Sequence, residues 1–215
     1  MIDANFRLIY VKDHLRISLT FDQTSPMHTI AKTYKKKDFP VHMIRRFLEP
    51  GPILLVSSCW RGKTNLMTMG WHTVLEFSPS LVGCMISSGS HSFDMIRKSR
   101  ECVLNVPTTN LMRQVIGIGN VHGDKIDKFE KFHLTPQNGT YVHAPIVKEC
   151  YANLECKLHD DRLVSKYNFF IFEVVKAHAP ASPKYPETIH YTGDGVFMLS
   201  GKHVNYQKFF KKENL

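Results

Sequence analysis

The feature that most constrains the fold is a series of short β-type segments, which starts near residue 51 and continues through most of the chain. Residues 53–56 form an apolar run bounded by Pro52 and Ser57, as expected for a buried strand. Residues 151–158 alternate apolar and polar side chains, which is the period of a strand with one buried face. The predicted strands are residues 53–56, 68–77, 81–87, 151–158 and 169–175.

Only three short segments have the spacing of a helix: residues 92–99, 109–116 and 124–132. Many strands with few helices between them predict a mainly β (α+β) fold, a closed antiparallel barrel with short helical insertions. The 215 residues suffice for one domain with its own core. Residues 1–26 end at a break, Ser25-Pro26, so we expect residues 27–215 to form the domain and residues 1–26 an extension.

The charge of the chain permits an acidic partner without requiring one. The sequence has 28 Lys and Arg against 19 Asp and Glu, a net charge of +9. Part of the excess lies near the chain ends, at residues 35–37 and 208–212, where solvated tails are more common than binding grooves. No known nucleic-acid motif is present, so a basic β-barrel that binds nucleic acid is kept only as a distant alternative.

The cysteines indicate a reducing environment. There are five, at positions 59, 84, 102, 150 and 156, and no CxxC pair occurs, which argues against a disulfide framework and against a zinc site. We therefore expect no bound metal. The N-terminus lacks a secretory signal and no window is apolar enough to span a membrane, so we expect a cytoplasmic protein without membrane contact.

Two segments carry groups suited to a ligand. The sequence from Asn65 to Trp71 offers an amide, a hydroxyl and an aromatic wall, provided that a turn into a strand brings Asn65 and Thr68 together. The sequence 87–92, Ser-Ser-Gly-Ser-His-Ser, stands between a predicted strand and a predicted helix, where hydroxyl and backbone N–H groups form an anion site. Ordinary alternatives remain for both segments, a turn with a core tryptophan and simple capping by serine.

Seven motifs in order resemble the flavin reductase-like domain family, the FMN-binding split barrels, and most closely its flavoredoxin-type branch. The resemblance covers roughly residues 40–200 and leaves residues 1–26 without a counterpart. The motifs are NLMTMGW (65–71), SSGSHSFDMI (87–96), ECVLNVP (101–107), DKF (127–129), APIVKECYANLEC (144–156), YNFFIFEVV (167–175) and GDGVF (193–197).

The resemblance implies a six-stranded antiparallel barrel that binds FMN non-covalently and leaves the chemistry to the flavin, with no catalytic side chain. It implies that Asn65, Met67 and Thr68 contact the flavin and that Trp71 helps to wall the pocket. Ser88, His91 and Ser92 would receive the phosphate, with charge from Lys128. The remaining implied positions are Asn168 and Phe197 at the flavin and His190 at the flavin edge or substrate.

The implied function is that of a flavin reductase with NADH or NADPH as the electron donor. Asn168 stands where many flavin reductases have the histidine of a Gly-Asp-His triplet, so a flavoredoxin-like electron carrier, reduced by a partner protein, is the alternative. The implied assembly is a homodimer that completes two equivalent pockets. We expect its interface to use apolar residues of segments 67–71 and 169–175.

Overall fold

The computed structural model describes residues 51–212, all of which belong to one compact unit, Phe39–Leu215. The expected boundary between residues 1–26 and 27–215 lies outside the described residues. Among residues 51–212, no helix is long and apolar enough to cross a membrane.

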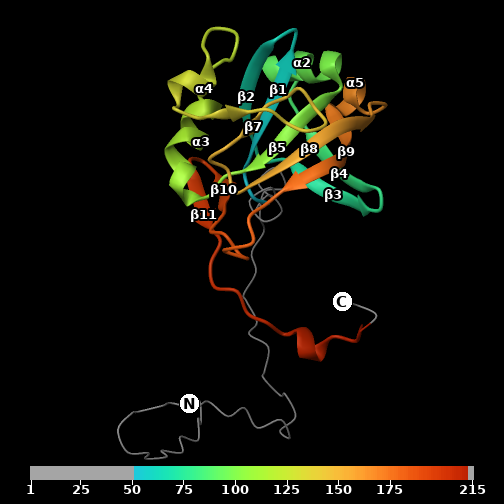
Figure 1. The fold of residues 1–215 in the computed structure, drawn as a ribbon, viewed down its shortest axis with the longest axis vertical. Helices are drawn as coiled ribbons and strands as arrows, with labels where there is room; N and C mark the ends of the chain where they lie inside the picture. The colour runs from blue at the N-terminus through green and yellow to red at the C-terminus, as the bar shows by residue number, and fades with distance from the viewer. Residues whose placement is uncertain (1–50, 213–215) are drawn as a thin grey trace, which may run out of the picture. The chain divides into compact units, whose positions relative to one another are not determined.

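One seven-stranded antiparallel sheet forms the body of the domain (Figure 1). Its strand order is β2-β1-β5-β8-β9-β4-β3, so the two edge strands, β2 and β3, are consecutive in the chain. Two small sheets pair β10 with β11 and β6 with β7. The strands are β1 (Leu54–Trp60), β2 (Lys63–Met69), β3 (His72–Phe77), β4 (Ser80–Met85), β5 (Glu101–Val106), β6 (Pro136–Gln137), β7 (Ile146–Val147), β8 (Ala152–Asp160), β9 (Phe169–His178), β10 (Ile189–Gly193) and β11 (Val196–Leu199).

The helices are short and few, as the sequence predicts. Each predicted helical segment overlaps one α-helix, although the third helix is much shorter than residues 124–132. The helices are α2 (His91–Ser99), η2 (Thr109–Leu111), α3 (Met112–Gly119), α4 (Lys128–Lys131), α5 (Val164–Tyr167) and η3 (Gln207–Phe209).

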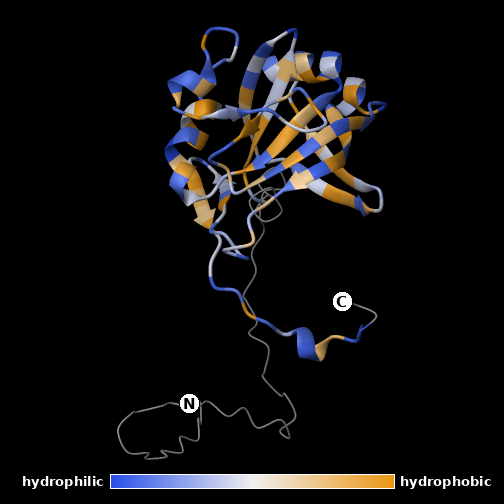
Figure 2. Cartoon of the chain, viewed as in Figure 1, coloured by the Kyte–Doolittle hydropathy of each residue, from blue (hydrophilic) through white to orange (hydrophobic). Residues whose placement is uncertain are grey.

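The sheet buries apolar side chains on both faces. Leu54 and Val56 point into the barrel, whereas Ile53 and Leu55 point to the other face, because successive side chains of an extended chain alternate. Figure 2 shows hydrophobic residues in most strands of the sheet, with hydrophilic residues between them. The second face is covered by α3, α4 and the β10–β11 hairpin, which lie on one side of the sheet in Figure 1.

Helix α2 packs on the barrel interior through aromatic contacts. Phe93 meets the ring of Phe170 edge-on, with centroids 5.3 Å apart, and Phe170 stacks on Phe172 at 5.8 Å. The rings of Phe170 and Phe172, both on β9, are fully buried. The apolar side chains on the opposite face of β9, among them Phe169 and Ile171, are only partly buried, so the expected interface at residues 169–175 stays a prediction.

The mainly β fold is confirmed, with two corrections of detail. The sheet has seven strands instead of six, and the single strand predicted over residues 68–77 is two strands. The chain leaves β2 at Gly70 and Trp71 and continues as β3 at the opposite edge.

Four of the five cysteines are buried, as expected for small apolar residues. Burial raises the pKa of the Cys150 thiol to about 12, and it also raises the pKa values of the Cys84 and Cys102 thiols.

Candidate functional site

The motif at residues 65–71 starts in β2, one edge strand of the sheet, and ends in the link to β3, the other edge strand. Asn65 and Thr68 both lie within β2, three residues apart, so they point to opposite faces of this edge strand. The sequence hypothesis of a turn that presents them together is therefore corrected. A ligand that contacts both side chains has to lie along the edge of β2.

Asn65 is buried and only half of its amide is bonded. Its Nδ2 donates to Ser92 Oγ at 2.9 Å, and Ser92 is itself fully buried in the first turn of α2. Asn65 Oδ1, in contrast, is the one buried side-chain polar atom within residues 51–212 that has no hydrogen-bond partner. Leaving such a group unpaired costs about 1–3 kcal/mol, so an unpaired atom inside a predicted site points to a missing ligand.

On the other face of β2, Thr68 borders a cavity of about 730 Å³. Three aromatic side chains line the cavity, Trp71, Tyr191 and Phe197, and the rings of Tyr191 and Phe197 are 5.1 Å apart. Thr68 Oγ1 donates to the carbonyl of Val115 at 2.7 Å, which ties β2 to α3. The cavity thus has the flat aromatic walls that suit a planar heterocyclic ligand, and it brings together the predicted residues Thr68, Trp71 and Phe197.

The turn before α2 presents the predicted anion site. Ser90 is the N-cap of α2 in an extended conformation, and its side chain makes no capping hydrogen bond. The hydroxyl instead lies 3.6 Å from the Sδ of Met67, which places Met67 beside this turn. Ser88 is exposed and His91 is half-buried at the helix start. Ser92, by comparison, is turned inward to Asn65, so its predicted role as a phosphate ligand stays a prediction.

A hollow of about 620 Å³ adjoins the start of α2. Its lining includes His91, Lys63 and Lys125 together with two carboxylates, Asp124 and Asp127. Both carboxylates are already engaged. Asp124 pairs with His122 at 2.8 Å, and Asp127 accepts hydrogen bonds from the backbone of α4. The hollow thus holds basic and acidic groups side by side, and Lys63, Lys125 and His91 are its candidate partners for an anion.

The Lys128 ammonium group points elsewhere. Lys128 is buried, its Nζ donates to the carbonyl of Ile118 at 3.0 Å, and burial lowers its pKa to about 8. In this position Lys128 holds the C-terminal turn of α3, which borders the aromatic cavity through Gly119.

Two further predicted residues lie outside the linings of the aromatic cavity and of the hollow beside α2. Asn168 ends α5 in the left-handed conformation, with φ at 56°, and its carbonyl accepts from Ile86 N just before the 87–92 turn. His190 lies on β10 with Nε2 2.8 Å from Thr188 Oγ1. Its neighbour Tyr191 lines the aromatic cavity.

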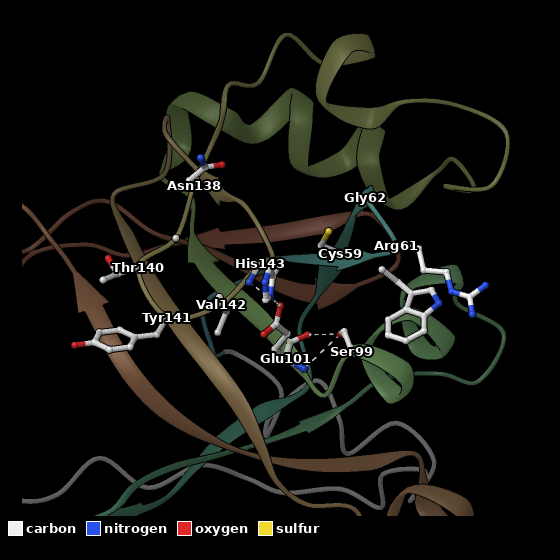
Figure 3. A pocket seen from close by; sticks show the side chains of 12 residues that line it. Cys59, Arg61, Gly62, Ser99, Glu101, Asn138, Thr140, Tyr141, Val142 and His143 are labelled. Carbon is white, nitrogen blue, oxygen red and sulfur yellow. Dashed lines mark hydrogen bonds and ion pairs between the residues drawn. The ribbon is translucent and has the colours of Figure 1, made fainter.

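A larger cavity of about 900 Å³ lies away from these residues (Figure 3). It is bordered by Cys59, Arg61, Glu101 and the loop from Asn138 to His143. Glu101 Oε1 accepts from the backbone N–H of His143 at 2.6 Å, so the loop is fixed to the sheet at this point. None of the predicted ligand-binding residues lines this cavity.

Comparisons with known proteins agree with this arrangement. Residues 44–198 match the model of the family described as "Flavin reductase like domain". An uncharacterized protein of Archaeoglobus fulgidus is 35% identical over 145 residues, which are 67% of this chain and 74% of that protein.

Solved structures with the same fold include two of interest. The FMN-binding domain of a flavin reductases-like enzyme from Shewanella baltica OS155 is 25% identical, with a TM-score of 0.65, over 79% of this chain and 96% of that chain. A flavoredoxin from Methanosarcina acetivorans has a TM-score of 0.71 over 85% of this chain and 100% of that chain, at 21% identity. The family match at residues 44–198 includes all seven strands of the large sheet.

Proposed function

Because the chain belongs to the family of flavin reductase-like domains, we propose that it binds FMN non-covalently and works as a flavin-dependent oxidoreductase. The observation that carries the proposal is the unpaired Oδ1 of Asn65. It lies on the edge strand between the turn before α2 and the aromatic cavity. A polar ligand along this edge would supply the hydrogen bond that the fold leaves unmade.

The residues present fit FMN at both ends of the molecule. The aromatic cavity lies within the range of about 300–1,000 Å³ that small-molecule sites have. The turn before α2, with His91 and the lysines of the adjoining hollow, offers donors and positive charge for the phosphate. Residues 119–127 border both spaces, through Gly119 and Asn120 at the cavity and Gly123 to Asp127 at the hollow.

Bound FMN would supply the hydride and electron chemistry, and the protein would hold and shield it. Tyr191 and Phe197 enclose the cavity from the β10–β11 hairpin, which excludes water from an apolar ligand face. Trp71 is 48% exposed, so this wall borders solvent where a second substrate can approach. Asn65, fixed through Ser92, presents its Oδ1 to a donor on the ligand.

The donor that we propose is NADH or NADPH, which makes the chain an NAD(P)H-dependent flavin reductase. The test is to load the full-length chain with FMN and mix it anaerobically with each nicotinamide in a stopped-flow instrument. Loss of flavin absorbance with either donor supports the reductase. A protein that binds FMN but shows no bleaching with NADH or NADPH contradicts it.

A second candidate is an electron carrier that a partner protein reduces. The observation in its favour is Asn168, at the position where many flavin reductases have a histidine. The net charge of +9 would attract an acidic partner such as a ferredoxin. Reduction by a ferredoxin but not by nicotinamides, with a rate that falls as salt rises, would decide for this candidate.

We also propose a homodimer, with β3 in its interface. Val74, Leu75 and Phe77 are 63%, 44% and 87% exposed on this edge strand. An exposed apolar edge strand is a surface that proteins usually cover. β3 follows Trp71 directly, so a second copy on β3 would lie next to the aromatic cavity.

A further inference from the structure

The chain between α3 and α4, residues 120–127, packs over Asn65 through a glycine. A Cβ at Gly123 would lie 1.9 Å from Asn65 Oδ1, so a larger residue here would force either the segment or the Asn65 side chain to move. Despite this close approach, Asn65 Oδ1 receives no hydrogen bond. The segment therefore lies beside the unpaired oxygen without donating a hydrogen bond to it. A donor on a ligand would supply this missing hydrogen bond.

His122 joins this segment to the opposite wall of the site. Its Nδ1 is 2.8 Å from Asp124 Oδ1, and its Nε2 is 3.3 Å from the carbonyl oxygen of Gly89, in the turn before α2. Both partners are acceptors, so the ring makes both hydrogen bonds only when both nitrogens carry a proton. The two bonds are complete only in the imidazolium state.

Other charged groups face the same space. Lys125 and Asp127 come from the segment itself, Lys63 from β2, and His91 from α2, with its ring centroid 6.3 Å from that of His122. The hydrogen bond from His122 is the main cause that lowers the pKa of the Asp124 carboxyl. Asp127 is engaged at α4.

We propose that residues 120–127 form a lid over the phosphate end of the flavin site, in which Gly123 allows the lid to seat on Asn65 and His122 is the positioning residue that fastens it to Gly89. The inference rests on the proposed function, since it requires FMN beside α2. Protonated His122 fastens the lid at both contacts, and neutral His122 loses one of them. FMN should therefore leave more slowly at acidic than at alkaline pH, because only the doubly protonated ring makes both hydrogen bonds.

The first test measures FMN release by stopped-flow flavin fluorescence from the full-length chain at pH 5.5 and pH 8. His122→Gln should speed release at pH 5.5 about fivefold, which corresponds to the loss of one ordinary hydrogen bond. It should change release little at pH 8. The matched control is His159→Gln, because His159 forms a comparably exposed pair with Glu173 on the sheet. The control should keep the wild-type rates at both values.

The second test prevents the lid from seating. Gly123→Ala should increase both the association and the release rate of FMN several-fold, since the added methyl group cannot fit against Asn65. The matched control is Gly201→Ala, where a Cβ would have no neighbour within 4 Å. Without FMN, the backbone amides of residues 121–125 should exchange hydrogen faster in Gly123→Ala than in the wild type.

The outcomes separate the lid from the flavin site. Normal FMN affinity with unchanged rates in both variants would overturn the lid and leave the proposed function in place. Unchanged hydrogen exchange in Gly123→Ala would count against the lid in the same way. A wild-type chain that does not quench FMN fluorescence would overturn the proposed function, and with it the lid.

Discussion

Asn65 has an amide whose two ends differ in their surroundings, and this difference gives a test at the level of one residue. In Asn65→Leu, a side chain of similar size removes the unpaired oxygen together with the bond to Ser92. The variant no longer buries an unpaired oxygen, and this gain in stability is at least as large as the loss of one ordinary hydrogen bond. The ligand-free variant should therefore be as stable as the wild type or more stable. Its FMN affinity should fall about tenfold or more, measured by fluorescence titration.

Asn153 is the matched control for that change. It is also buried, but its Nδ2 is bonded both to Asn105 Oδ1 and to the carbonyl of Val147. Asn153→Leu leaves both acceptors with a lost partner and should destabilise the fold by about 2 kcal/mol in urea unfolding. FMN affinity should not change. Equal losses of stability in the two variants would show that Asn65 is an ordinary structural amide.

Glu155 gives a prediction for acid stability. Burial alone would raise its pKa, but the hydrogen bond from His178 and the backbone N–H groups of Thr140, Tyr141 and Val142 prevail and hold the pKa at about 2, against 4.5 for the free group. The folded pKa lies below the unfolded one, so this stabilisation is present above pH 4.5 and is lost as the pH falls to about 2. The difference corresponds to about 3 kcal/mol.

Thermal unfolding between pH 6 and pH 2 measures this contribution. Glu155→Gln should be less stable at pH 6 and should lose less stability on acidification than the wild type does. The exposed Glu130 supplies the control, Glu130→Gln, which should follow the wild-type curve. If Glu155→Gln lost stability with falling pH as steeply as the wild type does, other carboxylates would govern the acid transition.

At the scale of elements, α2 links the core to the site. Phe93 anchors the helix on Phe170, and the preceding residue, Ser92, fixes Asn65. Phe93→Ala should cost about 3–5 kcal/mol of unfolding free energy and should also weaken FMN binding, because the helix start would no longer be held. Leu163→Ala, at a 40% exposed apolar side chain, should change neither quantity appreciably. If Phe93→Ala were destabilised but bound FMN as tightly as the wild type, the packing of α2 would not determine FMN binding.

The sequence predicted the elements better than their ends. Apolar runs and the period of two located β1, β4, β8 and β9, because these patterns record burial directly. The same patterns joined part of β2 to β3, since Gly70 and Trp71 carry the chain from one edge strand to the other without interrupting the apolar character. The motifs found Thr68, Trp71 and Phe197 at one cavity, but they could not show that Asn65 and Thr68 face opposite ways or that Gly123 packs against Asn65. Those facts depend on which segments pack together, and no local pattern records them.

At the scale of the whole molecule, the proposed dimer makes FMN binding depend on protein concentration. If a second copy on β3 helps to complete the site, dilution below the dimer dissociation constant must weaken FMN binding, as linkage requires. Leu75→Arg places a charge on the exposed apolar strand and should convert dimer to monomer in light scattering, with a parallel loss of FMN affinity. Lys176→Arg, on the exposed part of β9, is the control and should change neither. A monomeric Leu75→Arg that binds FMN as tightly as the wild type would show that one chain closes the site alone.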